Sequence, residues 1–278
     1  MSATQLLVTT SAPAGSPRYT LLVAQQRADI RAAQRLRHRV FADEMGAVLH
    51  TPEPGLDIDD YDAHCDHLVV RDDATGEIVG TYRMLSPDGA RRAGGRYCET
   101  EFLIPTLAGL RDTLVETGRS CVHPHHRTGA VVNLVWAGIA RYMVLTGYRW
   151  LVGCVSVPLR SPDAPDGALA MGVWDTVRTR HLAPERYRVT PRRPWDVATT
   201  CRSGDADLAL ASQRPSLPPL LRGYLRLGAW VCGPPAYDPD FGVADFLVLL
   251  GLDQVDPRYL HHFLGPDFPG PDFPGYRV

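Results

Sequence analysis

The stretch that decides the fold is residues 111–146, which read RDTLVETGRSCVHPHHRTGAVVNLVWAGIARYMVLT. Residues 111–122 are typical of a strand. The apolar residues from about position 130 to 146 predict a long helix, and the short loop 123–129 joins the two elements. A strand that passes through a short loop into a helix indicates the central unit of a mixed α/β sheet.

The segments around this unit predict one more helix and four more strands. Residues 27–45 form an amphipathic helix, because Ile30, Ala33, Leu36, Val40 and Phe41 recur at steps of three and four. The resulting order, strand-helix-strand-strand-strand-helix-strand, predicts an α/β (α+β) fold with a mixed central sheet flanked by helices. The expected strands are residues 19–24, 67–71, 77–85 and 150–158, with a hairpin turn at 73–76.

The C-terminal half carries weaker patterns. Residues 159–216 are polar and rich in Pro and Arg, which predicts loops with one or two strands. Residues 217–231 favour a helix, 246–252 a buried strand and 257–264 a short helix. We therefore expect a lead-in without fixed structure (1–17), a single domain (18–264, with its core at 18–158 and a C-terminal elaboration at 159–264) and a Pro/Gly-rich tail (265–278).

Composition excludes several kinds of protein. The 278 residues are 45% hydrophobic with a formal charge of −2, too balanced for a general nucleic-acid binder. All 29 basic residues are arginine, which excludes a Schiff-base lysine and a phosphate-binding loop lysine. The six cysteines form no CxxC pair, which predicts reduced thiols in a cytoplasmic protein. The first 17 residues lack the features of a signal peptide.

Glu116 is the candidate proton acceptor. An amine must lose a proton before it can be acylated, and a carboxylate, acting directly or through a water, can take that proton. Arg119 lies on the opposite face of a regular strand, but a bulge would bring the two side chains together. The alternative is a plain ion pair between Glu116 and Arg119 on the strand surface.

An acidic loop precedes these strands and could bind a cationic amine. It lacks the glycine and distal glutamate of an EF-hand, and its alternative role is that of a solvated loop. Its carboxylates are Asp57, Asp59, Asp60 and Asp62.

Two arginines accompany this acidic loop. Arg37 and Arg83 could clamp a carboxylate through two hydrogen bonds. An equal alternative is that Arg37 orders the loop by pairing with Asp59 or Asp62. Phe41 fits the core better than a substrate contact.

Residues 123–130 form a loop that leads into a helix N-terminus, which offers free N–H groups to phosphate. Gly129 is the only glycine in the loop, which suits a ligand with one phosphate better than one with a pyrophosphate. Zinc is disfavoured, since the three histidines and Cys121 have no second ligand cluster at standard spacing. A covalent role for Cys121 would need a general base.

These residues resemble known acyltransferases. The order of elements is similar to the GNAT fold, and the motif residues are similar to those of acyl-homoserine-lactone synthases, although an aromatic six positions after Phe41 in that family is Ala47 here. The sequence resembles the ornithine–acyl carrier protein N-acyltransferases, or hemolysin-like enzymes, more closely, over about residues 19–264. The shared segments are CDHL (65–68), GRSCV (118–122), GYLRLG (223–228) and the Asp-Phe pairs at 240–241 and 245–246.

This resemblance implies an N-acyltransferase that moves a long-chain 3-hydroxyacyl group from acyl carrier protein to the α-amine of ornithine, which gives lyso-ornithine lipid. Glu116 would accept the proton, and backbone N–H groups of residues 119–122 would hold the oxyanion. No metal or cofactor is expected beyond the donor's acyl-phosphopantetheine. Arg119 is the second expected catalytic residue. The other expected site residues are Arg37, Phe41, Asp59, Asp62 and Arg83 for the acceptor side, and Ser120, Cys121, Val122, Arg127 and Gly129 for the donor side.

Two alternatives remain. One is an enzyme that acylates another acceptor, such as tyrosine or glutamine, or makes an acyl-amine signal. The other is a non-catalytic GNAT-like protein that acts on membranes or as a binding module. An amphiphilic product would also bring a cytoplasmic enzyme to the inner face of the membrane.

Overall fold

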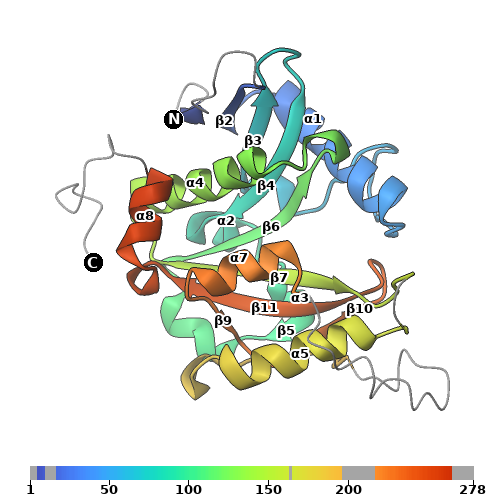
Figure 1. Ribbon diagram of the computed structural model, residues 1–278, viewed down its shortest axis with the longest axis vertical. Helices are drawn as coiled ribbons and strands as arrows, with labels where there is room; N and C mark the ends of the chain where they lie inside the picture. The colour runs from blue at the N-terminus through green and yellow to red at the C-terminus, as the bar shows by residue number, and fades with distance from the viewer. Residues whose placement is uncertain (1–4, 10–16, 163–164, 196–216, 265–278) are drawn as a thin grey trace. The chain divides into compact units, whose positions relative to one another are not determined.

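The computed structural model describes residues 5–9, 17–162, 165–195 and 217–264 (Figure 1). The chain divides into two compact units. The first takes its residues from Met1–Gly94, Thr113–Arg149 and Asp256–Val278, and the second from Gly95–Asp112 and Trp150–Val255. The core expected at 18–158 is therefore shared between the units. The expected tail, 265–278, lies outside the described residues.

An antiparallel sheet with a helix on each face forms the first unit. Helix α1 packs against β2, β3, β4 and β6, and helix α4 packs against β1 to β4 from the other side (Figure 1). A methyl group at Gly80 of β4 would touch Val131 of α4, whereas Arg83 points to the opposite face. The elements, in sheet order and then helices, are β1 (Gln5–Thr9), β2 (Tyr19–Ala24), β3 (Asp66–Asp72), β4 (Ile78–Leu85), β6 (Leu114–Val122), α1 (Arg27–His38) and α4 (Gly129–Thr146).

Most predicted elements of this unit are confirmed. The predicted helix 27–45 is α1 followed by a π-helix over Arg39–Glu44, in which Met45 N–H donates to Val40 O at 3.1 Å. Phe41 is buried in this segment. The predicted strand 111–122 begins only at Leu114, because Pro105–Leu110 forms a 3-10 helix before it.

The expected lead-in is wrong at five residues. Gln5–Thr9 form β1, which pairs antiparallel with β2 from Gln5↔Val23 to Thr9↔Thr20. The segment reads QLLVT, and its leucines, valine and threonine suit an added edge strand. The remaining residues of the expected lead-in up to residue 16 lie outside the described part.

Helix α4 is the core helix of this unit. It ends at Gly147, whose φ of 72° is the left-handed conformation that closes many helices. Gly138 lets α4 approach β2, because a Cβ there would lie 2.6 Å from a Leu21 side-chain carbon. The helix is long and apolar enough to cross a membrane, but 61% of it is buried within the structure, as in a core helix.

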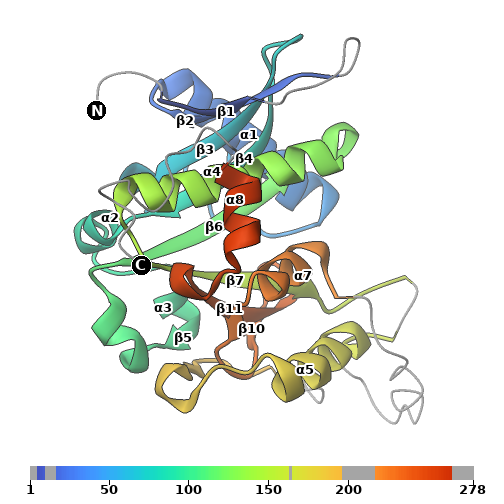
Figure 2. The same cartoon turned by 60° about the vertical axis from the view of Figure 1, so that its left-hand side comes forward.

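Helix α8 (Pro257–Leu264) confirms the predicted short helix and packs on α4 (Figure 2). The rings of Trp136 and Phe263 stack at 6.5 Å, and Arg141 Nη2 donates to Leu264 O at 2.7 Å. A short helix, α2 (Pro87–Arg92), follows β4 and is capped by Ser86, which accepts a hydrogen bond from Gly89 N–H at 3.1 Å.

The second unit contains a further run of antiparallel strands. Its central pair is β7 (Trp150–Pro158) with β11 (Val243–Gly251), and every residue of β11 is buried. A two-stranded sheet, β5 (Phe102–Leu103) with β8 (Thr190–Pro191), accompanies it. The other elements are α3 (Cys98–Glu101), α5 (Ala168–Arg180), α7 (Pro219–Arg226), β9 (Trp230–Val231) and β10 (Ala236–Asp238).

Two predictions for this half need correction. Residues 168–180 form helix α5 rather than loops, because Ala170, Val173 and Val177 bury one side of it despite the polar residues around them. The predicted helix 217–231 stops at Arg226, since Gly228 adopts a φ of 92° and the chain then enters β9.

Three carboxyl groups lie together inside the second unit. Oxygens of Glu101 (α3), Asp238 (β10) and Asp245 (β11) lie within 4.8 Å of one another, and both aspartates are buried. Burial, reinforced by the charge of Asp245, holds the pKa of Glu101 far above its ordinary value. Glu101 is therefore protonated at neutral pH.

We predict that Glu101→Gln stabilises the protein at pH 8 and weakens the pH dependence of stability. The folded state holds this proton and the unfolded state loses it, so the free energy of unfolding falls as pH rises above the ordinary glutamate pKa of about 4.3, by at most about 1.4 kcal/mol per pH unit. Urea unfolding at pH 5, 6.5 and 8 measures this, with the exposed Glu185→Gln as control. A less stable variant at pH 8 would contradict it.

Candidate active site

Arg37 lies at the centre of a buried charge cluster on the α1 side of the first unit's sheet. Its Nη1 and Nη2 atoms donate to the two carboxylate oxygens of Asp62 at 2.9 and 2.6 Å. Its Nε lies 2.9 Å from Asp57 Oδ2, and its Nη2 also donates to the carbonyl oxygen of Asp57. The Arg37 side chain is completely buried, so these two aspartates balance its charge inside the protein.

Two further arginines contact the same acidic loop. Arg83 Nη1 of β4 lies 2.9 Å from Asp62 Oδ1 and 2.5 Å from Asp59 Oδ1. Arg119 of β6 lies 3.1 Å from Asp57 through Nε and 3.3 Å from Asp59 through Nη2. Each arginine therefore bridges two aspartates.

The contacts form a closed charge ring, named by its order Asp62–Arg37–Asp57–Arg119–Asp59–Arg83. It contains three positive and three negative side chains, so its net charge is zero. Asp59 and Arg119 are its most exposed members, with side-chain exposures of 20% and 14%, while those of the other four are at most 6%. The ring thus has a buried side and one edge that solvent reaches.

Neighbouring charges keep Asp62 and Arg83 ionised. Burial alone would raise the pKa of Asp62, but the hydrogen bonds and charge of Arg37 and the charge of Arg83 outweigh it and hold that pKa far below its usual range. Burial alone would lower the pKa of Arg83, but Asp59 and Asp62 raise it instead. Asp62 and Arg83 therefore keep their charges throughout the physiological pH range.

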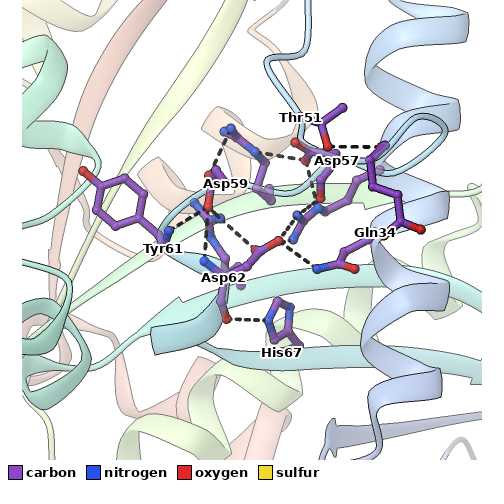
Figure 3. Close-up of polar contacts among 11 residues, drawn as sticks. Gln34, Thr51, Asp57, Asp59, Tyr61, Asp62 and His67 are labelled. Carbon is purple, nitrogen blue, oxygen red and sulfur yellow. Dashed lines mark hydrogen bonds and ion pairs between the residues drawn. The ribbon is translucent and has the colours of Figure 1, made fainter.

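Neutral groups fix the geometry of the acidic loop (Figure 3). Gln34 Nε2 of α1 donates to Asp62 Oδ2 at 3.1 Å, and His67 Nε2 of β3 lies 3.1 Å from the carbonyl oxygen of Asp62. Asp59 Oδ1 accepts hydrogen bonds from the N–H groups of Tyr61 and Asp62 at 3.0 and 3.2 Å, which makes a local turn. The loop is thereby fixed at both its backbone and its side chains.

Strand β6 contains a bulge, which the sequence leaves open. Thr81 pairs with Cys121 and Arg83 with Gly118, so two residues of β6 oppose Tyr82 of β4. Arg119 has a φ of 52°, an uncommon conformation for a residue with a side chain. The bulge turns Arg119 toward the ring, where it meets Asp57 and Asp59.

Glu116 is buried on β6, with a residue exposure of 5%. It pairs with Leu85, two positions from the Arg83–Gly118 pair, so it shares the sheet face of Arg83. Burial raises the pKa of Cys65 to about 12, and the charges of Asp62, Asp59 and Glu116 add to the effect while that of Arg83 opposes it. The charges of Glu116 and of two ring aspartates therefore all reach the Cys65 thiol, which shows that Glu116 lies near the ring.

The expected donor residues surround the loop between β6 and α4. Arg127 forms two hydrogen bonds of 2.6 Å with Glu44 and donates from Nε to Val122 O at 3.2 Å. Ser120 and Val122 are half-buried, and Gly129 is the exposed first residue of α4. Arg127 thus ties the loop to the π-helix, at the place where the sequence predicts the donor.

An open cleft of about 470 Å³ lies beside this loop. Arg39 Nη1 donates to His123 Nε2 at 2.7 Å across it. Burial, the charge of Arg39 and the other two histidines lower the pKa of His123, which is therefore neutral at neutral pH. The cleft is lined by Arg39, Asp43, Glu44, His123, Pro124 and His125.

The chemistry of Cys121 differs from that of a nucleophile. Cys121 is buried, and burial raises the pKa of its thiol to about 12, so it is protonated at neutral pH. Within the described residues, the three histidines and Cys121 do not bring three ligand atoms together. The loop therefore offers neither a thiolate nor a closed metal site in this arrangement.

Sequence reasoning identifies five of the six ring members, but it misses the role of Asp57 and of the two neutral residues that contact Asp62. It gives Asp57 only as a member of the acidic loop, and it assigns Gln34 and His67 no role. Gln34 lies three residues before Arg37 on α1, a spacing that places both on one helix face. A buried polar residue at that spacing is the available signal.

We predict that Arg37→Met destabilises the protein by about 3–5 kcal/mol, because it leaves the buried cluster one positive charge short and removes one of the two guanidiniums that Asp57 and Asp62 each contact. Urea unfolding at pH 7 measures the loss. The matched control is Arg31→Met, since Arg31 lies on the same helix and pairs with Glu53 at an exposed site. Equal effects of the two substitutions would contradict a special role for the ring.

Comparison with known proteins gives the family. The model of the acetyltransferase (GNAT) domain family matches residues 36–137, which include the ring, Glu116 and the donor loop. The chain is 38% identical over 257 residues to an L-ornithine N(alpha)-acyltransferase of Rhizobium meliloti (strain 1021), covering 87% of this chain and 82% of that protein. It is 34% identical over 258 residues to the protein of the same name from Brucella abortus (strain 2308), covering 87% of each.

A solved structure supports the fold. A CoA-dependent acyl-homoserine lactone synthase, BjaI, with SAM and isopentyl-CoA matches with a TM-score of 0.50 over 90% of each chain, at 15% identity. The expected GNAT-like fold and the expected acyltransferase class are both confirmed. The chain belongs to the L-ornithine N(alpha)-acyltransferase family and is an N-acyltransferase of the GNAT fold.

Proposed function

We propose that this enzyme transfers a long-chain 3-hydroxyacyl group from acyl carrier protein to the α-amine of ornithine, which gives lyso-ornithine lipid. The acceptor is inferred from relatives named L-ornithine N(alpha)-acyltransferase, which match over most of their length. The observation that supports the chemistry is the closed charge ring, which shares a sheet face with the buried Glu116. Together these supply charge recognition and a proton acceptor.

Ornithine carries two amines and one carboxylate, so its site needs both signs of charge. The charge ring presents both at its exposed edge, where Asp59 and Arg119 lie 3.3 Å apart. We assign Asp59 to the cationic end of the acceptor and Arg119 to its carboxylate. Arg37, Arg83 and Asp62 are buried and hold that edge in place, and Phe41 is a buried core residue.

Acylation then proceeds by direct attack. The amine nitrogen forms a bond to the thioester carbonyl carbon, the carbon–sulfur bond breaks, and phosphopantetheine leaves as the thiol. Glu116 accepts the amine proton, directly or through a water, and the proton passes to the leaving sulfur. The bulge interrupts regular pairing at Arg119 and Ser120, so backbone N–H groups of residues 119–122 suit the oxyanion.

The donor is assigned to the loop that follows β6. The loop holds a single glycine, Gly129, and ends at the N-terminus of α4, where free N–H groups favour one phosphate. Arg39 and His123 line the cleft beside it, and Arg127 donates from Nε to Val122 O at the start of the loop. This suits the single phosphate of acyl-phosphopantetheine. The amphiphilic product would place the cytoplasmic enzyme against the inner face of the membrane.

Mass spectrometry of the reaction tests this function. Purified enzyme receives 3-hydroxyacyl carrier protein, or the matching acyl-CoA, with a pool of amino acids. The expected product has the mass of acyl-ornithine and depends on the carrier protein. A product on another amino acid would identify the alternative acceptor, and no product with either donor would contradict the enzyme's assignment.

We predict that Glu116→Gln lowers kcat by about 10²–10⁴-fold, because the amide cannot accept the amine proton. Initial rates with saturating donor and acceptor measure this. The control is Glu77→Gln, since Glu77 is exposed on the hairpin turn between β3 and β4. A Glu116→Gln enzyme with nearly normal kcat would exclude Glu116 as the proton acceptor.

We predict that Asp59→Asn raises the KM for ornithine about tenfold and changes the KM for the donor little. Loss of one charge-assisted contact of about 1.5–3 kcal/mol accounts for an effect of this size. The exposed neighbour Asp60→Asn is the control, since no described ion pair includes it. If Asp60→Asn raises the KM as much, the acceptor's cationic end is read by the loop's overall charge rather than by Asp59.

A further inference from the structure

We propose that His67 is a positioning residue for the acceptor site, which holds Asp62 in the charge ring by acting as a neutral hydrogen-bond donor. The proposal rests on the proposed function, because it assigns that site one more residue. His67 lies in the segment CDHL and is absent from the ring itself. His67 holds the backbone of Asp62, while Arg37 and Arg83 hold the Asp62 carboxylate.

The geometry fixes the protonation of the His67 ring. The side chain is almost completely buried, with an exposure of 1%, and its Nε2 lies 3.1 Å from the carbonyl oxygen of Asp62. A carbonyl oxygen can only accept a hydrogen bond, so Nε2 carries the proton. Nδ1 is buried too and has no hydrogen-bond partner among the described residues. The imidazole of His67 is therefore the neutral tautomer, with a proton on Nε2 and none on Nδ1.

The hydrogen bond from His67 holds Asp62, on which the buried side of the charge ring depends. Asp62 begins the short 3-10 helix Asp62–His64, and its carboxylate lies between Arg37 and Arg83. His67 stands opposite Arg83 in the register of β3 and β4. The strand that follows the loop thus holds the loop's last acidic residue at its backbone. Without this bond, Asp62 can rotate away from one of the arginines.

The charges around His67 favour this neutral form. The groups that act on it are Asp62 from the loop, Arg37 from α1 and Arg83 from β4, with the neutral Gln34 also on Asp62. Burial, followed by the two arginines, lowers the pKa of His67, and Asp62 opposes them. A proton on Nδ1 of His67 would place a fourth positive charge beside the charge ring, whose net charge is already zero.

As a consequence, binding of the acceptor should weaken at acid pH. Histidine in the unfolded chain has a pKa of about 6.5, and the pKa of His67 in the folded site is lower. As pH falls below the ordinary histidine range, protonation of His67 therefore favours a disordered acceptor site over the ordered one. Asp62 does not titrate there, because its own pKa is held far lower. The KM for ornithine should rise on the acid side while kcat changes less.

Two variants separate positioning from simple packing. In His67→Gln, the amide nitrogen stands as many bonds from the backbone as Nε2, so it can donate to the Asp62 carbonyl but cannot titrate. In His67→Asn, the amide is one bond shorter and cannot reach it. We expect His67→Gln to keep kcat/KM for ornithine within about twofold at pH 7.5, and His67→Asn to lose about five- to tenfold through KM.

The pH profile gives the decisive readout. We expect the KM of the wild-type enzyme to rise between pH 7.5 and 5.5, and His67→Gln should abolish this rise. If His67→Gln keeps the wild-type profile, another group such as Glu116 carries the limit and the proposal is wrong. If His67→Asn matches the wild type in KM, the hydrogen bond to Asp62 has no positioning role, and the proposal is equally wrong.

A measurement without substrate distinguishes this proposal from the proposed function. Nitrogen-15 spectra of histidine-labelled enzyme at pH 7 should show His67, identified by its loss in His67→Gln, with a protonated Nε2 and an unprotonated Nδ1. A doubly protonated ring would overturn the proposal whichever acceptor the enzyme uses. If the acceptor is another amino acid, the KM comparison is made with that amino acid, and the assignment of His67 stands or falls on its own.

Discussion

The alternation of charge in the ring is the constraint on which the rest of the site depends. A single buried charge costs several kcal/mol of desolvation, and a buried pair is stable only with good geometry and further hydrogen bonds. Here each guanidinium bridges two carboxylates and each carboxylate meets two guanidiniums. The net charge of the ring is zero, so six ionised groups share a small region that solvent reaches only at the Asp59–Arg119 edge.

The fold contributes the three arginines of the ring from three different elements and the three aspartates from one loop. Helix α1 carries Arg37 on its sheet-facing side, β4 carries Arg83, and the acidic loop before β3 carries the aspartates. Arg119 arrives only because β6 bulges and Arg119 accepts a φ of 52°. Strain of this kind persists where surrounding contacts over-determine it, and the two ion pairs of Arg119 are such contacts. The same strand then presents Glu116, so recognition and chemistry share one scaffold.

Local patterns in the sequence predict the elements well and the ring only partly. The period of α1, the hairpin turn at 73–76 and the apolar run of α4 are short-range signals, and each element is found. Helix α5 escapes prediction because Arg and Pro around it hide the spacing of Val173 and Val177. The ring joins residues 20 to 62 positions apart, and no local pattern shows which arginine meets which aspartate. His67 escapes prediction because a single polar residue in a strand is usually exposed.

A double-mutant cycle on Arg37 and Arg83 tests the central claim most directly. These arginines are joined in the charge ring by Asp62, which both bind. The free energies of unfolding of Arg37→Met, Arg83→Met and the double variant are measured by urea unfolding. The closed ring predicts that the effects are non-additive by more than about 0.5 kcal/mol, because either substitution already breaks the balance of charge. Additive effects would show that the arginines act independently and would contradict the ring.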